Sequence, residues 1–486
     1  MRKGIRFLLG HEPREIDRID PTMTVLEYLR RVEHRMGTKE GCAEGDCGAC
    51  TVLVVRRVGD ALRHEPINAC IRFVPTLDGC QLLTVEDLKA PDGTLHPAQQ
   101  AMVDTHGSQC GFCTPGVVMS LAALHRSGLE PTRETVDDVL AGNLCRCTGY
   151  GPIIAAAQTM AATEGSDRHL RDREPDVLRH LTEIDDGATF TVGLGNRELI
   201  SPGTADDLAK AYLRHPDATI LSGGTDVGLL VTKLHRQLDT VIWLGRVKEL
   251  QQIEETADEI RLGAGVTYRD AAPVLASHWP ELGELFRRLG AVQVRNAGTV
   301  GGNIANGSPI GDSPPALIAL GASITLRHGQ DRRRLPLEDF FIAYGKQDRR
   351  PGEFVESVHI PKSDPRSLFR VWKISKRSDQ DISAVCGAFD LRIEDGKVTA
   401  ARIAFGGMAA TPKRATATEA ALVGRPWTKP TVEAAMAAMG EDYRPIDDMR
   451  ASAGYRLRVA RNLLLKYWLE STGGVPAPTP RTPVLV

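Results

Sequence analysis

The sequence lacks any apolar stretch that approaches the length of a membrane span, and only a short apolar run precedes the charged residues in its opening segment, MRKGIRFLLGHEPREID. We therefore expect neither a secretory signal nor a membrane association, and predict a reducing, cytoplasmic location. Net charge is also nearly absent, because 60 basic side chains oppose 62 acidic ones. No basic stripe interleaved with aromatic residues occurs, so a nucleic-acid partner is not expected.

The usual nucleotide-binding signatures are missing as well. Neither the GxGxxG dinucleotide fingerprint nor a Walker A loop occurs, and no internal repeat is evident. Any bound nucleotide therefore uses a non-Rossmann arrangement. The chain has 486 residues, 42% of them hydrophobic and 25% charged, which is ordinary globular chemistry and enough for about three domains.

Cysteine is plentiful and patterned, since eight of the ten cysteines fall into two quartets. The first quartet consists of Cys42, Cys47, Cys50 and Cys70. Gaps of four and two residues followed by a distant fourth cysteine are the plant-type spacing for a [2Fe-2S] cluster. The loop reads GCAEGDCGAC. Its glycines allow left-handed backbone angles and bring N–H groups close to anionic sulfur.

The second quartet has a two-residue gap, a long excursion and a one-residue gap. It consists of Cys110, Cys113, Cys145 and Cys147. Helix-start signals follow both pairs: Thr114 and Pro115 follow Cys113, and Pro152 begins an alanine-rich segment after Cys147. A cluster held by four thiolates is an anion, which helix N-termini stabilise. The pattern indicates a second [2Fe-2S] site.

Two other uses of these cysteines stay open at this point. An even cysteine count can indicate disulfides, although these are typical of small secreted proteins and this N-terminus does not resemble a signal. Structural zinc suits the CxxC and CxC pairs of the second quartet better than it suits the first quartet. Cys80 and Cys386 remain outside both quartets and are expected to be small buried apolar residues.

Local patterns divide the chain into regions. Strands at Ile5–Leu9 and Thr51–Arg56 and a helix at Thr24–Val32 predict a small ferredoxin-like α+β unit. Four helices follow, at Pro97–Asp104, Pro115–Leu124, Thr135–Leu140 and Pro152–Ala162. Residues 164–186 are charged without a steady apolar period and are interpreted as a solvated connector.

Helices and strands alternate in the region that follows the connector, for example at Asp206–Arg214 and Ala218–Leu221. Further along, Asp395-Gly396 separates two apolar runs and predicts a β-hairpin. The Pro-rich end, GGVPAPTPRTPVLV, is expected to be flexible or to lie on a partner.

Two glycine-rich stretches stand out in that region. Leu221–Asp226 reads LSGGTD after an apolar strand, so its backbone N–H groups could form a nest for a pyrophosphate. Thr299–Asp312 reads TVGGNIANGSPIGD, with the small residues expected where backbone approaches a flat ligand closely. An ordinary irregular loop is the alternative for the second stretch.

Taken in order, the two cysteine motifs and the SGGTD and TVGGNIANGSPIGD stretches resemble the molybdenum hydroxylase family over nearly the whole chain. Within that family, the arrangement is similar to the small subunits of bacterial xanthine dehydrogenases. The resemblance implies a multidomain α+β fold. Its parts would be a ferredoxin-like β-grasp [2Fe-2S] domain (1–88), a four-helix [2Fe-2S] domain (89–163), a linker (164–190), a vanillyl-alcohol-oxidase-type FAD domain (191–365), an α+β C-terminal flavoprotein subdomain (366–472) and a flexible tail (473–486).

The resemblance also implies the residues that contact FAD. They are Ile220, Leu221, Ser222, Gly223, Gly224, Thr225, Asp226, Val227, Thr299, Val300, Gly301, Gly302, Asn303, Asp312 and Lys373. The pyrophosphate is expected over Gly223 and Gly224. Leu289 stands where many relatives place a phenylalanine against the flavin. No residue of this chain is assigned as a catalytic base or nucleophile.

The function that the resemblance implies is electron transfer in an oxidoreductase. Electrons from a partner's molybdenum centre, released as hypoxanthine or xanthine is oxidised to urate, would reach the second quartet, then the first, then FAD and finally NAD. The expected partner is a large molybdopterin-binding subunit in a dimer of heterodimers. Alternatives are an aldehyde or N-heterocycle hydroxylase, a free-standing NADH-dependent iron-sulfur flavoprotein reductase, and a non-enzymatic zinc scaffold.

Overall fold

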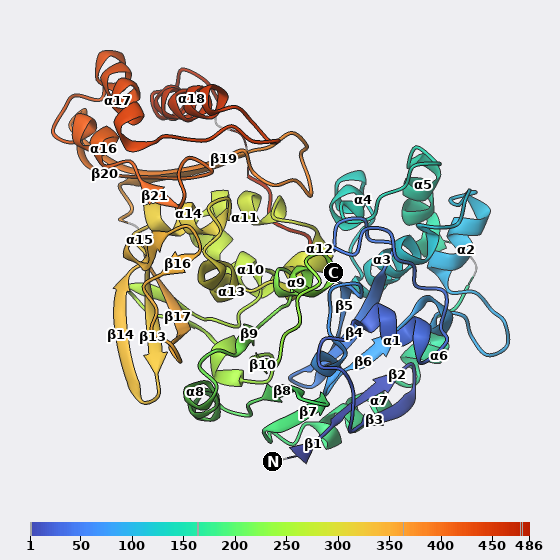
Figure 1. The fold of residues 1–486 in the computed structure, drawn as a ribbon. Helices are drawn as coiled ribbons and strands as arrows, with labels where there is room; N and C mark the ends of the chain where they lie inside the picture. The colour runs from blue at the N-terminus through green and yellow to red at the C-terminus, as the bar shows by residue number, and fades with distance from the viewer. Residues whose placement is uncertain (1, 163–164, 363, 477, 479) are drawn as a thin grey trace. The chain divides into compact units, whose positions relative to one another are not determined.

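The computed structural model describes residues 2–162, 165–362, 364–476, 478 and 480–486 (Figure 1). The chain forms two compact units. The first contains Met1–Lys248, Gly290–Gly298 and Val484–Val486, and the second contains Glu249–Leu289 and Thr299–Pro483. The boundary expected at residues 163 and 164 lies outside the described residues.

The first unit begins with a five-stranded mixed sheet in the order β3-β2-β6-β4-β5. Its strands are β2 (Ile5–Leu9), β3 (Glu12–Ile16), β4 (Thr51–Val58), β5 (Ala61–Asn68) and β6 (Gln81–Leu83). Helix α1 (Val25–Arg31) starts where the Thr24 side chain accepts a hydrogen bond from the Glu27 N–H group at 3.1 Å. The predicted strands and helix of this α+β unit are confirmed.

Four helices follow, as the sequence predicts: α2 (Pro97–Asp104), α3 (Thr114–Ser127), α4 (Arg133–Leu140) and α5 (Gly151–Thr159). Prolines occupy the first turns of α3 and α5. The N-cap of α3 is Cys113 rather than Thr114, which lies inside the helix. Buried Leu121, Val136 and Ile153 join a core to which Leu53 and Val55 of β4 also contribute.

The segment expected to be a solvated connector is partly helical. It contains α6 (Arg168–Arg171) and α7 (Glu174–Ile184). Val177, Leu181 and Ile184 of α7 are buried against Leu8 of β2. Their spacing of four and three residues places them on one helical face, but the charged residues around them hide this short stripe in the sequence. The prediction of a solvated linker is wrong for α7.

We expect Leu181→Ala to lower the free energy of unfolding by about 2–5 kcal/mol, because it leaves a cavity beneath a packed helix. Leu181 is only 1% exposed. Glu183→Ala, at an exposed position of the same helix, should change stability by no more than about 0.5 kcal/mol. Urea titration followed by circular dichroism measures both. Equal effects of the two substitutions would show that α7 does not pack as described.

A second sheet in the first unit has the order β1-β7-β8-β10-β9. Its strands are β1 (Arg2–Lys3), β7 (Phe190–Leu194), β8 (Arg197–Ser201), β9 (Thr219–Leu221) and β10 (Thr240–Trp243). The N-terminal strand β1 pairs in parallel with β7, so residues from the start of the chain complete a sheet built mainly after residue 190. Helices α8 (Ala205–Arg214), α9 (Val227–Thr232) and α12 (Val292–Ala297) belong to the same unit.

The second unit contains a five-stranded antiparallel sheet with the order β11-β12-β17-β13-β14. Its strands are β11 (Ile253–Glu255), β12 (Glu259–Gly263), β13 (Ser323–His328), β14 (Asp331–Pro336) and β17 (Phe354–Pro361). The helices of this part are α10 (Tyr268–His278), α11 (Pro280–Arg287), α13 (Val300–Asn306), α14 (Ser313–Ala319) and α15 (Leu337–Phe340), and β15 (Phe341–Ala343) pairs with β16 (Lys346–Gln347).

The C-terminal part of the second unit is a four-stranded sheet with three helices. It consists of β18 (Ser367–Ile374), β19 (Val385–Glu394), β20 (Lys397–Gly406), β21 (Lys413–Arg414), α16 (Thr416–Leu422), α17 (Lys429–Asp442) and α18 (Ala453–Ser471). Asp395 and Gly396 form the predicted hairpin turn with φ of 50° and 70°. Phe389, Phe405 and Tyr467 lie in the core of this part.

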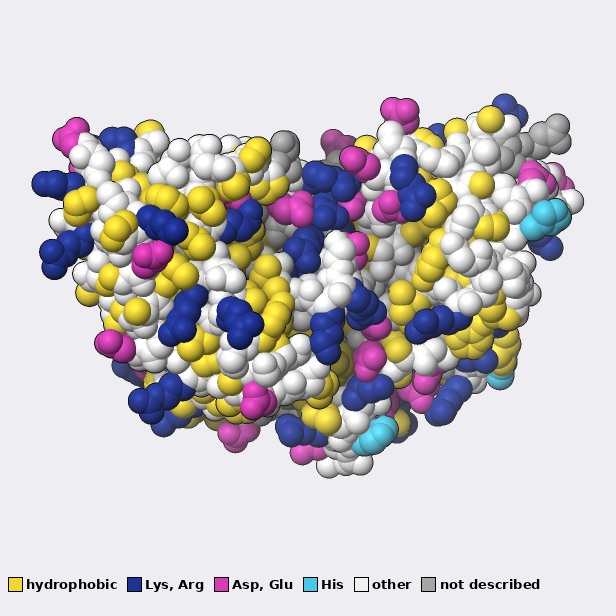
Figure 2. All heavy atoms as spheres, turned by 90° about the horizontal axis from the view of Figure 1, so that it is seen from above, with side chains coloured by type: hydrophobic (Ala, Val, Ile, Leu, Met, Phe, Trp, Pro, Cys, Tyr) yellow, Lys and Arg dark blue, Asp and Glu magenta, His cyan; other side chains and the backbone are white. Residues whose placement is uncertain are grey.

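The end of the chain differs from the prediction of a flexible tail. Val486 is 3% exposed and packs with Val484 into the core that contains α2–α5. Within the described ranges, none of the helices combines the length and apolar character needed to cross a bilayer. Basic and acidic side chains are mixed on the face drawn in Figure 2, in agreement with the small net charge.

Candidate cofactor sites

The first cysteine quartet gathers at one place in the first unit. Cys42, Cys47 and Cys50 lie on the segment between α1 and β4, and Cys70 follows β5. As thiols they hydrogen bond to one another, Cys42 to Cys47 and Cys70, and Cys50 to Cys70. These bonds lower the pKa of Cys42 and raise that of Cys47, because one sulfur of each pair donates and the other accepts. The four sulfur atoms therefore converge as a cluster requires.

Backbone donors surround this quartet. The N–H groups of Glu44, Asp46 and Cys47 each donate to the Cys42 Sγ at 3.4 Å. The Asn68 side-chain amide lies 3.9 Å from the Cys50 Sγ. Donors directed at sulfur stabilise an anionic thiolate centre. The residues present therefore fit a [2Fe-2S] cluster.

The second quartet also converges. Cys110 bonds to Cys147 and Cys113 to Cys145 when all are thiols. Burial raises the pKa of Cys113 to about 12. For Cys145, burial opposes ionisation, but hydrogen bonds led by the Thr148 hydroxyl lower the pKa overall. Helix α3 begins directly after Cys113, and α5 begins at Gly151, after a short turn that follows Cys147.

All ten cysteines, each of them among the described residues, are free. The quartets therefore form no disulfides. Cys80 and Cys386 are buried with 2% and 0% exposure, as expected for small apolar residues, and burial raises the pKa of both thiols.

Glycines let the two cysteine segments meet at backbone distance. A Cβ atom on Gly48 would lie 2.0 Å from the Gly142 carbonyl oxygen, and one on Gly116 would lie 2.1 Å from the Gly48 carbonyl oxygen. The Leu144 N–H group donates to the Cys47 carbonyl oxygen at 3.0 Å. A single hydrogen bond thus joins a ligand residue of the first quartet to the neighbour of Cys145.

A buried polar network fixes this contact. The Asn143 amide donates to the Gly48 carbonyl oxygen at 3.2 Å, and its Oδ1 accepts from the Ser120 hydroxyl at 2.7 Å. The Gln293 amide donates to the Asn143 Oδ1 and to the Thr51 hydroxyl, both at 3.2 Å. Neither Asn143 nor Gln293 is predicted from the sequence as a functional residue. Only the position of Asn143 two residues before Cys145 could have drawn attention to it.

We predict that Gly48→Ala removes iron from the first quartet, because the new methyl group would collide with Gly142 and displace the loop that bears Cys47 and Cys50. Gly59→Ala is the matched control: Gly59 also has a positive φ, of 60°, but nothing lies within 4 Å of its Cβ position. This control should keep both clusters and cost about 1–2 kcal/mol of backbone strain. Analysis of iron and acid-labile sulfide compares the cluster content of the two variants. Equal iron contents would contradict the prediction.

The predicted pyrophosphate loop, Ile220–Val227, lies in the first unit between β9 and α9. Gly224 has a φ of 80°, which favours glycine. A Cβ atom on Gly223 would lie 1.8 Å from the Ala297 carbonyl oxygen. Both glycines are thus required by the backbone. A phosphate on this loop stays a prediction.

The second predicted FAD segment, Thr299–Asn303, lies in the second unit. It is not an irregular loop but the start of α13, where the Thr299 hydroxyl accepts from the Gly302 N–H group at 3.1 Å. A Cβ atom on Gly301 would lie 2.5 Å from Ala264. The small residues therefore serve close helix packing as well as the predicted ligand contact.

Asp312 and Lys373, also in the second unit, form a buried ion pair. The Lys373 Nζ lies 2.6 Å from the Asp312 Oδ2, and their side chains are 3% and 7% exposed. The Ser383 hydroxyl donates to the other carboxylate oxygen, and the Cys386 thiol donates to the Asp312 carbonyl oxygen at 3.6 Å. Asp312 and Lys373 are predicted separately from the sequence, but their pairing and the role of Ser383 are not.

Lys373→Met should destabilise the protein by about 3–5 kcal/mol, because it leaves the Asp312 carboxylate buried without its counter-ion. Lys376→Met, at an exposed lysine three residues away, should change stability by no more than about 0.5 kcal/mol. Urea unfolding followed by tryptophan fluorescence compares them. A loss below about 1 kcal/mol for Lys373→Met would mean that the pair is not held in the dry environment described.

Four family models match successive parts of the chain. They are the 2Fe-2S iron-sulfur cluster binding domain (residues 9–74), the [2Fe-2S] binding domain (84–158), the FAD binding domain in molybdopterin dehydrogenase (194–363) and the CO dehydrogenase flavoprotein C-terminal domain (370–471). The chain carries the iron-sulfur, FAD-binding and flavoprotein domains of the molybdenum hydroxylase family. Each cysteine quartet lies within one of the two iron-sulfur matches. These domains bind [2Fe-2S] clusters, which argues against the zinc alternative.

Curated relatives with sequence similarity include members of this molybdenum hydroxylase family. Xanthine dehydrogenase of Emericella nidulans is 32% identical over 90% of this chain and 36% of that protein. Xanthine dehydrogenase of Drosophila pseudoobscura pseudoobscura is 32% identical over 93% of this chain and 38% of its own length. Aldehyde oxidase 1 of Bos taurus is 30% identical, also over 93% of this chain and 38% of its own length. The chain thus spans little more than a third of these relatives.

Two solved structures share part of the fold. One is a carbon monoxide dehydrogenase from Hydrogenophaga pseudoflava that lacks the Mo-pyranopterin moiety of its cofactor, with a TM-score of 0.53 and 29% identity, covering 56% of this chain and 96% of that one. The other is quinoline 2-oxidoreductase from Pseudomonas putida 86, with a TM-score of 0.52, 26% identity and the same two coverages. The predicted multidomain α+β class with two iron-sulfur domains and an FAD-binding domain is confirmed.

Proposed function

We propose that this chain is the electron-transfer subunit of a xanthine dehydrogenase, which takes electrons from a partner's molybdenum centre and delivers them to NAD. One observation carries the proposal: two converged cysteine quartets adjoin through the hydrogen bond from Leu144 to Cys47, in a chain that also has an FAD-binding domain. Such clusters carry single electrons, and a flavin can collect a pair for the nicotinamide. The work of this chain is to hold these groups in place.

The exposure of its cysteine side chains favours the second quartet as the place where electrons enter this chain. Cys110 and Cys147 are exposed, whereas Cys50 and Cys70 of the first quartet are buried. Phe112 and Leu144, which neighbour the second quartet in sequence, are 47% and 36% exposed. Apolar side chains beside exposed ligand cysteines suit a surface that another protein covers. We propose that a large molybdopterin-binding subunit docks there, in a dimer of heterodimers.

The substrate is proposed from similarity and depends on the partner. Similarity to xanthine dehydrogenases, such as that of Drosophila subobscura at 33% identity, supports hypoxanthine or xanthine as the reductant. An aldehyde is the second candidate, supported by the aldehyde oxidase of Bos taurus at 30% identity. No side chain of this chain is proposed to act on either substrate.

The proposed order of electron transfer has a direct test. In the complex with its partner, Cys145→Ser should abolish oxidation of hypoxanthine by NAD, because it removes a ligand of the entry cluster. It should spare NADH oxidation with an artificial acceptor at the flavin, which does not need that cluster. Cys80→Ser is the control, because Cys80 is buried outside both quartets.

Steady-state assays with hypoxanthine and with an aldehyde, run on the copurified complex, read out these activities. Loss of both activities in a folded Cys145→Ser protein would contradict the proposed order. Turnover of the aldehyde but not of hypoxanthine would instead assign the chain to an aldehyde hydroxylase. Failure of any molybdopterin subunit to copurify would favour a free-standing reductase.

A further inference from the structure

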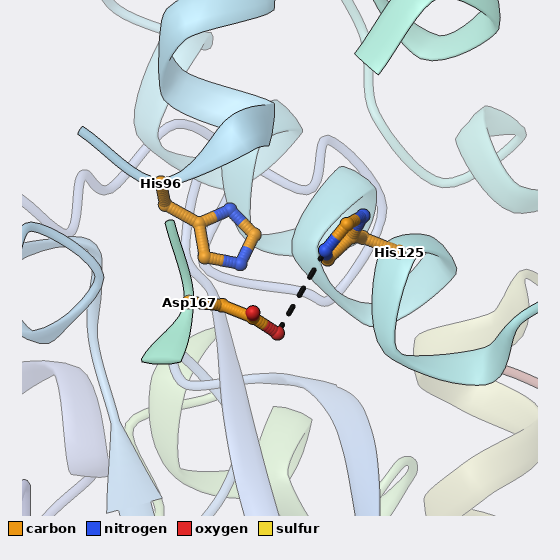
Figure 3. A group of neighbouring side chains, drawn as sticks. All are labelled: His96, His125 and Asp167. Carbon is orange, nitrogen blue, oxygen red and sulfur yellow. Dashed lines mark ion pairs between the residues drawn. The ribbon is translucent and has the colours of Figure 1, made fainter. Parts of the chain in front are cut away.

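Three potential metal ligands meet in the first unit outside both cysteine quartets. His96 precedes α2, His125 lies in the last turn of α3, and Asp167 precedes α6. One ligand atom from each lies within 4.8 Å of the other two. Figure 3 shows the two rings and the carboxylate converging, with the His125 Nε2 facing the Asp167 Oδ2 at 3.7 Å.

His96 supplies an independent sign that the group is incomplete. Its side chain is fully buried, with 0% exposure. Its Nδ1 accepts a hydrogen bond from the Ala98 N–H group at 3.1 Å, which caps α2. Its Nε2, on the side of the ring that faces the other two residues in Figure 3, has no hydrogen-bond partner among the described residues. A buried polar nitrogen without a partner is unfavourable whether it carries the ring proton or a lone pair, so a partner for it is expected.

Both imidazoles are suited to ligation because they are held neutral. Burial above all, together with the neighbouring His125, lowers the pKa of His96 to about 3. Burial also lowers the pKa of His125, against the opposing charge of Asp167. Metal ions bind neutral imidazole and ionised carboxylate. Neither histidine therefore has to be converted from the imidazolium form before it can bind a metal ion.

We propose that the His96 Nε2, the His125 Nε2 and the Asp167 carboxylate bind a zinc ion, with water completing a tetrahedral site. Two imidazoles and one carboxylate form a nitrogen and oxygen set that zinc accepts. The ion would tie α2 and α3 to the segment that leads into α6 and α7. This site is separate from the electron-transfer function proposed above.

Zinc ligation has a structural consequence at α2. The neutral His96 ring holds one proton, which sits on Nε2 while Nδ1 accepts from Ala98. Zinc needs the lone pair of Nε2, so the proton must move to Nδ1. The Ala98 N–H group then loses its capping acceptor, while the Gln99 side chain still accepts from the His96 N–H group at 3.2 Å. The start of α2 therefore reports zinc binding.

Two arginines compete with the ion for Asp167. Arg126 and Arg171 lie 3.2 and 2.5 Å from the Asp167 Oδ2. A carboxylate has two oxygens and about four lone-pair positions, so it can bind arginine and metal together. Arg126 also pairs with Glu174, and the Arg171 side chain is 53% exposed and free to turn into solvent. We therefore expect weaker binding than at a site made of four thiolates.

The test uses the full chain with both clusters and flavin in place, incubated with one equivalent of zinc chloride and desalted. Zinc K-edge X-ray absorption should show a nitrogen and oxygen shell at about 2.0–2.1 Å, whereas zinc in a cysteine quartet would show sulfur at about 2.3 Å. Competition with a zinc chelator measures the affinity. Hydrogen exchange of the Ala98 amide should become faster when zinc is bound.

Matched variants locate the site. His96→Asn keeps an N-cap acceptor for Ala98 but lacks Nε2. His125→Asn removes the second ring. Each should weaken zinc binding at least about tenfold. His169→Asn is the control, because the His169 Nε2 bonds to the Asp87 carbonyl oxygen at 3.1 Å, and it should bind zinc as the unaltered protein does.

The proposal is overturned if no zinc is retained, if sulfur dominates its shell, or if His125→Asn binds zinc as tightly as the unaltered protein. If His96→Asn fails to fold, the zinc affinity of His125→Asn and the hydrogen exchange rate of the Ala98 amide in the unaltered protein still test the proposal. Unchanged Ala98 exchange in zinc-loaded protein would also contradict ligation through the His96 Nε2.

Discussion

The structure of the first unit depends on a close backbone contact around Gly48. Two anionic redox centres held in one unit need little intervening side chain, and the close contact of Gly48 with Gly116 and Gly142 provides this. The Asn143 and Gln293 amide groups then donate hydrogen bonds to the Gly48 carbonyl oxygen and to the Asn143 Oδ1. Because every member of this network is buried, a small displacement would leave several polar groups unsatisfied, so the spacing of the two quartets is rigidly fixed.

The second unit uses burial differently. Asp312 and Lys373 form a buried ion pair completed by Ser383, which fixes the position of the lysine. That Lys373 lies near a flavin stays a prediction from the family resemblance. A buried pair of this kind contributes little net stability but fixes geometry when all its partners are present. Rigid sulfur loops in one unit and a fixed charge in the other are both forms of preorganisation, which lowers the rearrangement needed when an electron moves.

Much of this arrangement could be predicted from the sequence, because cysteine spacing and helix-start residues are local signals. Local signals also predict the strand Ile5–Leu9 from its apolar run, the helix Pro97–Asp104 from its first-turn proline and the turn from the Asp395-Gly396 pair. Helix α7, the packing of Val486 and the role of Gln293 were missed, since each depends on residues far away in the chain. The same holds for the group of His96, His125 and Asp167, whose members are widely separated in sequence.

Both cysteine quartets are expected to hold inorganic redox clusters in the same protein. Electron paramagnetic resonance of the anaerobically reduced protein, combined with metal analysis, is the decisive experiment. We expect two distinct [2Fe-2S] signals of equal intensity and about four iron atoms per chain. A protein with no such signal, or with zinc in place of iron at the cysteines, would contradict this expectation.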